Sequence, residues 1–493
     1  MTLSLPLYRS LLRSPWFPST LALVLAFAGH AEAQPVSPTV HESAGAEPSA
    51  PNAETVTPNR VPSAEPPAPS DAASQGEAIA APSPEPSAEA TTEFSPQPQS
   101  EPGLVPHAEP TLAPASTASE DSSAGPRVLK AQFGKGFLIG TADEKFTLNI
   151  RGRLQVQALF ADEPGDGGEV TQFQARRMRL LFQGNLLGEK LQYYFQLGFS
   201  NRDQEPDLRM PLRDAYITYS PFRDLSLRFG QGKVPYGRQR VTSSSALGMV
   251  DRSLVITEFT LDRDVGIYAF SKDLLGLGGR LGYSIGVFGG DGRNRLAENA
   301  GLLYVARINL TPLGPFEDNV EASLDFDPKP RLAIGFGGGY NQATNRPHST
   351  TGLPYADPNV HFDYAHLGAD VMFKWRGFFA MGEWMLRDSN TEEQLGVDAN
   401  DDPFTYVARK GWGAFGQLGQ MLTRHLELSA RYGYIEPLGT ASATPLVHEI
   451  GGGMSYYFLG HNLKLQADYF YISHQADLSQ GLNQGRLQAQ VYF

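Results

Sequence analysis

The stretch FTLNIRGRLQVQALF, residues 146–160, alternates apolar and polar side chains. The apolar positions are Phe146, Leu148, Ile150, Leu154, Val156, Ala158 and Phe160. Successive side chains of a β-strand point to opposite faces, so this period predicts a strand with one apolar and one polar face. The run is longer than the about five or six residues usual in soluble sheets, and it reaches the roughly 9–11 residues that a membrane-crossing strand needs.

The same alternation recurs in about sixteen runs, among them KLQYYFQLGFS at 190–200 and NLKLQADYFYISH at 462–474. Short connections alternate with long polar loops, except that the connection at 312–330 is long where a short turn is expected. Lipid offers no partner to the backbone at a sheet edge, so a membrane sheet must close on itself. The sequence therefore predicts an all-β fold, a transmembrane antiparallel β-barrel of about 16 strands. A soluble protein with amphipathic strands is the less favoured alternative.

The front of the chain differs from the predicted barrel. Residues 1–33 have the basic, apolar and small-residue regions of a signal peptide. Residues 34–126 are rich in Pro, Ala, Ser and Glu and poor in apolar side chains, so we expect a disordered extension there. This leaves 127–493 as the barrel domain. We expect it in the outer membrane of a Gram-negative cell, in contact with lipid, with the extension in the periplasm.

The net charge of −13 is not typical of the predicted barrel domain. Of the 53 acidic and 40 basic residues, 14 acidic and 3 basic ones precede residue 127. The remainder is almost balanced, and we expect no nucleic-acid partner. The chain has no cysteine, which a closed barrel does not need.

Arginines recur on the polar faces of the first predicted strands. They are Arg151 and Arg153 on the first, Arg177 and Arg179 on the second, and Arg228 on the fifth. Guanidinium groups offer fixed donors to oxyanions, so arginines along a lumen suit an anion pathway. Alternatively, they pair with acids such as Asp214 and Asp264 and only support the wall.

The loop at 232–262 is too apolar for a simple exposed loop. We expect it to fold inward and narrow the lumen. Its candidate anion-pathway residues are Lys233, Arg238, Arg240, Thr242, Ser243, Ser244 and Arg252. Cations beside hydroxyl groups suit an anion. Alternatively, Asp251 pairs locally with Arg252 and the serines form only a turn.

The last residue, Phe493, closes the alternating run LQAQVYF. It resembles the C-terminal assembly signal of outer-membrane barrels, which implies a barrel-assembly machinery as partner. The segment VDANDDPFT at 397–405 groups three aspartates but lacks the spacing of a calcium loop, and a solvated loop is favoured. No phosphate-binding loop, dinucleotide fingerprint or metal-ligand spacing is present in the sequence, so we expect no cofactor, no metal and no catalytic residue.

Three segments resemble the phosphate-selective porin O/P family. They are ARRMRLLFQGNL (175–186), LRDAYITYSPFRDLSLRFGQGKVPYGRQRVTSSSALGMVDRSL (212–254) and RDVGIYAF (263–270). The shared order is an Arg-rich strand, D-A-Y, a G-Q-x-K-x-P-Y-G turn, T-S-S and D-R-S. The resemblance implies a sixteen-stranded outer-membrane porin with a preference for anions such as phosphate, and a homotrimer.

We therefore expect passive diffusion of small anions through an Arg-lined lumen, without enzymatic activity. A general diffusion porin with weak selectivity is the first alternative. An outer-membrane anchor or an enzyme barrel is the second.

Overall fold

The computed structural model describes residues 128–163, 168–205, 207–296 and 301–493. The predicted signal peptide and the extension at 34–126 lie outside the described residues. The strands of the barrel wall are β3 (Thr147–Glu163), β4 (Gly168–Asn185), β5 (Leu191–Gly198), β6 (Leu212–Phe222), β7 (Leu225–Lys233), β8 (Arg263–Ser271), β9 (Leu281–Phe288), β10 (Leu303–Leu310), β11 (Arg331–Thr344), β12 (Phe362–Trp375), β13 (Phe378–Asp388), β16 (Gly411–Met421), β17 (Leu426–Pro437), β18 (Val447–Tyr457), β19 (Leu463–Ser473) and β20 (Leu482–Tyr492).

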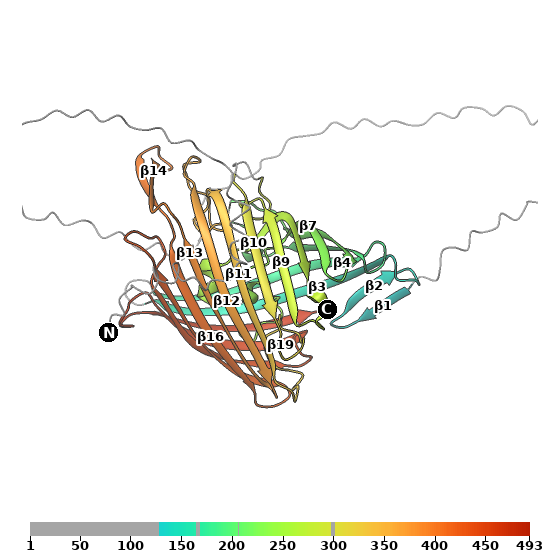
Figure 1. Ribbon diagram of the computed structural model, residues 1–493. Helices are drawn as coiled ribbons and strands as arrows, with labels where there is room; N and C mark the ends of the chain where they lie inside the picture. Colours follow the sequence, from blue (N-terminus) through green and yellow to red (C-terminus); the bar gives the residue numbers. More distant parts are fainter. Residues whose placement is uncertain (1–127, 164–167, 206, 297–300) are drawn as a thin grey trace, which may run out of the picture. The chain divides into compact units, whose positions relative to one another are not determined.

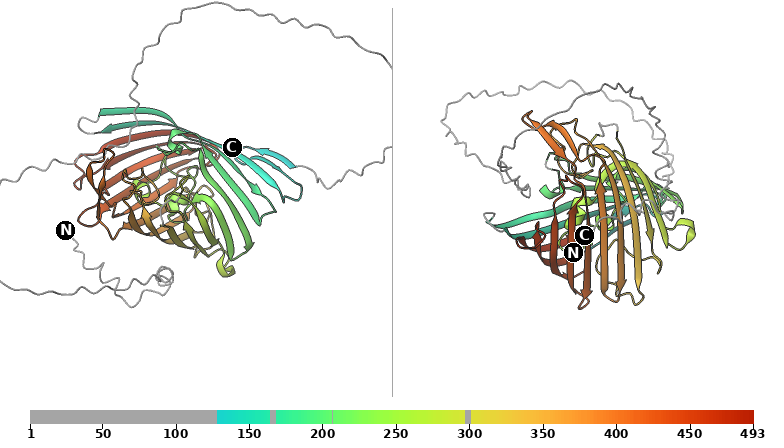
Figure 2. Two further views of the ribbon diagram at one scale, coloured as in Figure 1. Left: turned by 90° about the horizontal axis from the view of Figure 1, so that it is seen from above. Right: turned by 60° about the vertical axis from the view of Figure 1, so that its left-hand side comes forward.

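These sixteen strands form a closed antiparallel ring within an 18-stranded sheet (Figure 1). Neighbours in sequence pair with each other, and β20 pairs with β3 to close the ring, with Gln490 opposite Gln155. The two views of Figure 2 show the strands curving round an interior that also contains chain. The predicted barrel of about 16 strands is confirmed.

The outer face of the wall is apolar. Its exposed side chains include Leu154, Val156, Phe195, Ile217, Phe229, Ile267, Ile285, Leu367, Val371 and Leu418. They alternate with buried or half-buried residues along each strand, as the period of two requires. Among the described residues, no helix has the length and apolar character to cross a membrane.

The connections define two ends of the barrel. At the short-turn end β6 and β7, and β12 and β13, follow each other after two residues, whereas the long-loop end carries connections such as 345–361 and 389–410. The latter contains the hairpin of β14 (Glu393–Val397) and β15 (Pro403–Val407). Asp398 at its turn accepts the backbone amides of Asn400 and Asp402 at 2.7 and 3.1 Å. Within the described ranges, no cluster of three or more potential metal ligands occurs.

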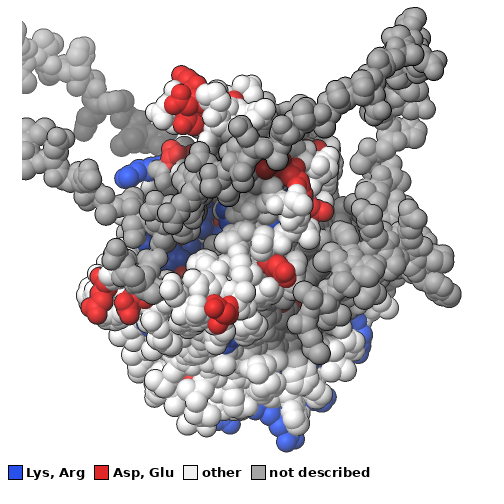
Figure 3. Space-filling model, turned by 90° about the vertical axis from the view of Figure 1, so that its left-hand side faces the viewer, with Lys and Arg blue, Asp and Glu red and all other residues white. Residues whose placement is uncertain are grey.

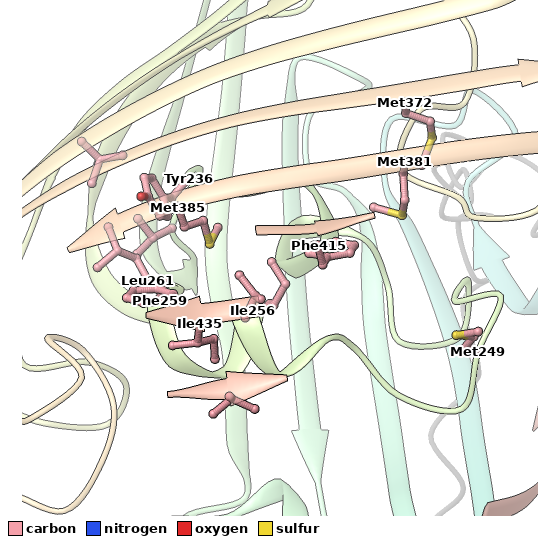
Figure 4. Close-up of a cluster of buried hydrophobic side chains, with 14 of the residues drawn as sticks. Tyr236, Met249, Ile256, Phe259, Leu261, Met372, Met381, Met385, Phe415 and Ile435 are labelled. Atoms are coloured by element: carbon pink, nitrogen blue, oxygen red, sulfur yellow. The ribbon is translucent and has the colours of Figure 1, made fainter. Parts of the chain in front are cut away.

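Residues 234–262, here called the inward loop, lie inside the barrel between β7 and β8. The loop contains the short helices α3 (Arg238–Val241) and α4 (Leu254–Phe259), and Ser253 caps α4. Its apolar side chains pack against lumen-facing side chains of the wall in one buried cluster (Figure 4). The labelled members are Tyr236, Met249, Ile256, Phe259 and Leu261 from the loop, and Met372, Met381, Met385, Phe415 and Ile435 from the wall. This packing explains why the loop is so apolar.

Residues 311–330, the inward turn, enter the lumen from the short-turn end and meet the inward loop. Glu321 is 1% exposed and accepts the amide of Gly248 at 2.8 Å and the Nε2 groups of Gln239 and Gln417 at 2.9 Å. The connection is long because it reaches into the lumen to make these contacts.

The hairpin of β1 (Val128–Gln132) and β2 (Gly136–Gly140) precedes the barrel wall, where the sequence analysis predicted no separate strands. Phe493 exchanges both backbone hydrogen bonds with Gly152 at 3.0 Å, and β2 then pairs with the next part of β3, placing Phe137 opposite Ile150. Strand β2 therefore pairs with β3 directly next to the place where the pairing of β20 with β3 ends.

Candidate functional site

A cavity of about 420 Å³ lies between the inward loop and strands β3 to β8. We call it the cationic cavity. It is lined by Arg153, Arg176, Arg177, Arg179, Tyr194, Gln196, Arg202, Arg213, Asp214, Tyr216, Arg228, Lys233, Pro235, Arg240, Val241, Ser243, Ser244, Arg252, Asp262, Arg263, Tyr268 and Arg293.

Positive charge dominates this lining. Eleven arginines and one lysine face two aspartates. In the part of the chain that the structure describes, three further carboxylates pair with lining arginines, namely Asp203, Glu205 and Asp251. Twelve cations thus meet five carboxylates. Figure 3 shows Lys and Arg atoms gathered in a recess of one face, with Asp and Glu atoms around it.

The arginines of β3 and β4 are held by the inward loop. Arg153 donates to the hydroxyl groups of Ser244 and Ser243 at 2.8 and 3.1 Å. Arg177 donates to Asp251 at 2.8 Å. Burial opposes the charge of Asp251, but Arg176 and Arg177 hold the pKa of this carboxyl well below its usual range. In the pairing of β3 with β4, Arg153 lies opposite Arg179 and Gln155 lies opposite Arg177.

Arg252 of the inward loop and Lys233 just before it bind to the backbone of the loop. Arg252 donates to the carbonyl oxygens of Gln239 and Thr242 at 2.8 and 2.7 Å. Lys233, at the end of β7, donates to those of Val241 and Thr242 at 2.8 and 3.1 Å. Burial, followed by the charges of Arg240 and Arg177, lowers the pKa of Arg252, which reflects a crowded positive environment. Carbonyl oxygens carry no formal charge, so these contacts do not neutralise the positive charge of Arg252 and Lys233.

Three predicted site residues do not line the cationic cavity. Arg238 is 1% exposed and pairs with Asp370 and Asp318. Thr242 is fully buried and donates to the carbonyl oxygen of its neighbour on the preceding helical turn. Arg151 stacks 3.9 Å from the ring centroid of Tyr492 and does not line the cavity. These three positions support the scaffold.

Five lining arginines were not among the predicted site residues: Arg176, Arg202, Arg213, Arg263 and Arg293. Arg263 pairs with Asp214 at 3.0 Å, so this acid binds an arginine other than the five that the wall-support alternative named. Asp264, the other acid considered, accepts the amides of Val265 and Gly290, each at 2.7 Å. The adjacent letters R-D at 213–214 and D-R-D at 262–264 were the available signal in the sequence.

The side of the cationic cavity formed by β5 to β8 carries aromatic rings. Tyr194 and Tyr216 stack with ring centroids 5.1 Å apart and planes 15° apart. The guanidinium of Arg228 lies 4.0 Å from the centroid of Tyr216 and 5.3 Å from that of Tyr268. These three tyrosines were not among the predicted site residues.

Residues 148–328 match the model of the family described as phosphate-selective porin O and P. The protein is an outer-membrane porin. The match runs from β3 through β10 to the inward turn, so it contains the inward loop and every residue that lines the cationic cavity. The family resemblance predicted from the motifs is confirmed over these residues.

The family motifs build the scaffold of the porin as well as its cavity. Tyr236 in the G-Q-x-K-x-P-Y-G turn donates to the carbonyl oxygen of Leu367 on β12 at 2.6 Å. Ser253 in D-R-S donates to Glu449 on β18 at 2.7 Å. The motif residues therefore fasten the inward loop to the wall at several points.

Several solved structures resemble the porin. OmpF of Salmonella typhi, in complex with daunomycin, is 14% identical, with 71% of this chain and 99% of that chain covered and a TM-score of 0.47. DcaP of Acinetobacter baumannii is 13% identical, with 70% and 97% covered and a TM-score of 0.46. An anion-selective porin from Comamonas acidovorans is 10% identical, with 70% and 99% covered and a TM-score of 0.45. No curated protein matches the chain significantly.

Proposed function

We propose that this porin lets small anions, phosphate among them, diffuse passively through the cationic cavity. The observation that carries the proposal is the excess of twelve cations over five carboxylates around one space. Such a field raises the local concentration of anions and disfavours cations. Guanidinium donors replace part of the hydration shell of an oxyanion that enters a narrow site. Transport then follows the concentration gradient, without catalysis or a cofactor.

The proposal includes an orientation and partners. We infer that the short-turn end faces the periplasm and the long-loop end faces outside, as in other outer-membrane barrels. Lipid then surrounds the apolar outer face, and the extension at 34–126 lies in the periplasm. We further propose that Phe493 is read by the barrel-assembly machinery and that the porin forms a homotrimer.

A general diffusion porin is the second candidate, and the ion pairs of the cavity favour it. Arg177, Arg179 and Arg263 each pair with an aspartate. Paired arginines contribute less to the field at the centre of the lumen than free ones. A pore dominated by such pairs conducts both ions with weak selectivity.

The reversal potential of the purified porin in a planar bilayer under a KCl gradient tests this proposal. We expect a clear anion preference, which falls in Arg153→Gln because Arg153 lies at the cavity and pairs with no acid among the described residues. Lys272→Gln is the matched control, since Lys272 is exposed in a turn. A preference that is weak in the wild type favours the general porin, and absence of conductance favours an anchor or enzyme barrel. Added phosphate, through the block that it causes, tests whether this anion binds in the pore.

A further inference from the structure

Four side chains on β5 to β8 form an aromatic shelf on the lumen face of the wall: Tyr194, Tyr216, Arg228 and Tyr268. The register explains the group, since Tyr194 lies opposite Tyr216, and Arg228 opposite Tyr268. Their sequence neighbours Phe195, Ile217, Phe229 and Ile267 are exposed on the outer face. Contact with lipid therefore does not account for the rings of the shelf, which lie on the opposite side of the wall.

Arg228 supplies an oriented charge within the shelf. Its Nε donates to Thr218 at 3.0 Å, and its guanidinium lies over the ring of Tyr216. Among the described residues, no acceptor binds its two terminal nitrogens and no acid lies within ion-pair distance. A guanidinium held in this way is free to donate two parallel hydrogen bonds to a carboxylate or another oxyanion.

An inorganic anion uses only the donors of such a site. The partly exposed ring surface beside Arg228 adds nothing to its binding, because small oxyanions have no apolar face. A planar ring that carries an oxyanion uses both parts, stacking on the tyrosines while its charged group reaches the guanidinium.

We propose that the preferred solutes are organic anions with an oxyanion on a planar ring, and that the aromatic shelf binds them. This inference rests on the proposed anion pathway and names its substrate class. The shelf lies beside the arginines of β3 and β4 in the same cavity, so a ring held on it keeps its charge within the cationic field.

The test compares block of the chloride current by benzoate, cyclohexanecarboxylate and inorganic phosphate at pH 8. The two carboxylates have the same charge and similar size, but only benzoate is planar. We expect benzoate to block at a concentration about threefold to tenfold lower than cyclohexanecarboxylate, the range that ring stacking provides. Phosphate is expected to block more weakly than benzoate. Equal block by the two carboxylates in the wild type overturns the inference.

Substitutions locate the effect. Tyr194→Leu combined with Tyr216→Leu is expected to remove the difference between the two carboxylates, whereas Tyr219→Leu, on the outer face of β6, is expected to keep it. Arg228→Gln is expected to weaken the block by both. A difference that survives in the double variant contradicts the role of the shelf. The KCl reversal potential separates the two proposals, since a cation-preferring wild type contradicts the anion pathway itself.

Discussion

Arg238 donates from Nε to Oδ1 of Asp370 at 2.6 Å, and this bond fixes the inward loop to β12. Arg240, two positions further on, lines the cationic cavity and pairs with Asp262. Residues two apart on a helical turn point in different directions, so these similar side chains reach different surroundings. One holds the loop in place, and the other presents charge to the lumen.

Substituting the two arginines separately distinguishes these roles. Arg240→Gln is expected to lower the anion preference measured from the reversal potential, while Asp262 keeps its ion pair with Arg263. Arg238→Gln is expected to destabilise the folded porin by about 3–5 kcal/mol, the usual effect of breaking a buried ion pair. The temperature at which the folded band disappears in gel electrophoresis reports the second effect. Similar stability of both variants would contradict this assignment.

Glu321 joins the inward turn to the inward loop, so Glu321→Gln is expected to loosen both. The Glu321 carboxylate accepts three hydrogen bonds. The side-chain amide of glutamine would turn an N–H group towards one of these three donors, and that hydrogen bond would be lost. We expect larger and noisier single-channel currents from this variant. Glu317→Gln, on an exposed residue of the same turn, serves as the control. Identical current traces from both variants would show that the inward turn does not restrict the pathway.

The contact between Gly152 and Phe493 predicts an assembly defect. A Cβ atom at Gly152 would lie 2.3 Å from the Phe493 ring, so Gly152→Val forces this terminal aromatic ring out of its place against β3. We expect less folded porin in the outer membrane for this variant and for deletion of Phe493. Gly416→Ala is the matched control, since a Cβ there meets no atom within 4 Å. Equal amounts of folded protein in all variants would count against the contact as an assembly requirement.

Anion preference is expected to stay constant between pH 8 and about 4.5. Arg176 and Arg177 depress the pKa of Asp251 in the folded porin. The ion pairs of Asp251, which anchor the inward loop, therefore stabilise the fold at every pH above about 3.8, the ordinary pKa of an aspartate. This stabilisation is lost only when the pH falls well below that value. Of the described residues that line the cavity, none is a histidine. A change of reversal potential centred near pH 6 would require another titrating group.

The wall and the inward loop were predictable from the sequence, because both depend on local patterns. Period-two alternation fixed which side of each strand is apolar, and the apolar residues around Met249 indicated a buried loop. The partners of individual arginines were not predictable. Arg179 on β4 pairs with Asp203 in the connection after β5, and Arg238 in the inward loop pairs with Asp370 on β12, far along the chain. Only the closed barrel brings such residues together.

The unusual length of the 311–330 connection was visible in the sequence, but its entry into the lumen was not. Its burial depends on contacts such as that between Glu321 and Gly248, which lie 73 positions apart. The hairpin of β1 and β2 was also missed. Its strands are five residues each, too short to show the alternating run that indicates a membrane-spanning strand.

The apolar cluster inside the lumen gives this membrane barrel a calorimetric property of water-soluble proteins. The outer face of the barrel wall stays in an apolar medium when detergent replaces lipid. By contrast, Phe259, Ile256 and Met381 become exposed to water when the inward loop leaves its place in the lumen. Hydration of apolar surface raises the heat capacity. Release of the loop is therefore expected to proceed with a positive heat-capacity change, and its free energy to vary with temperature along a curve that has a maximum.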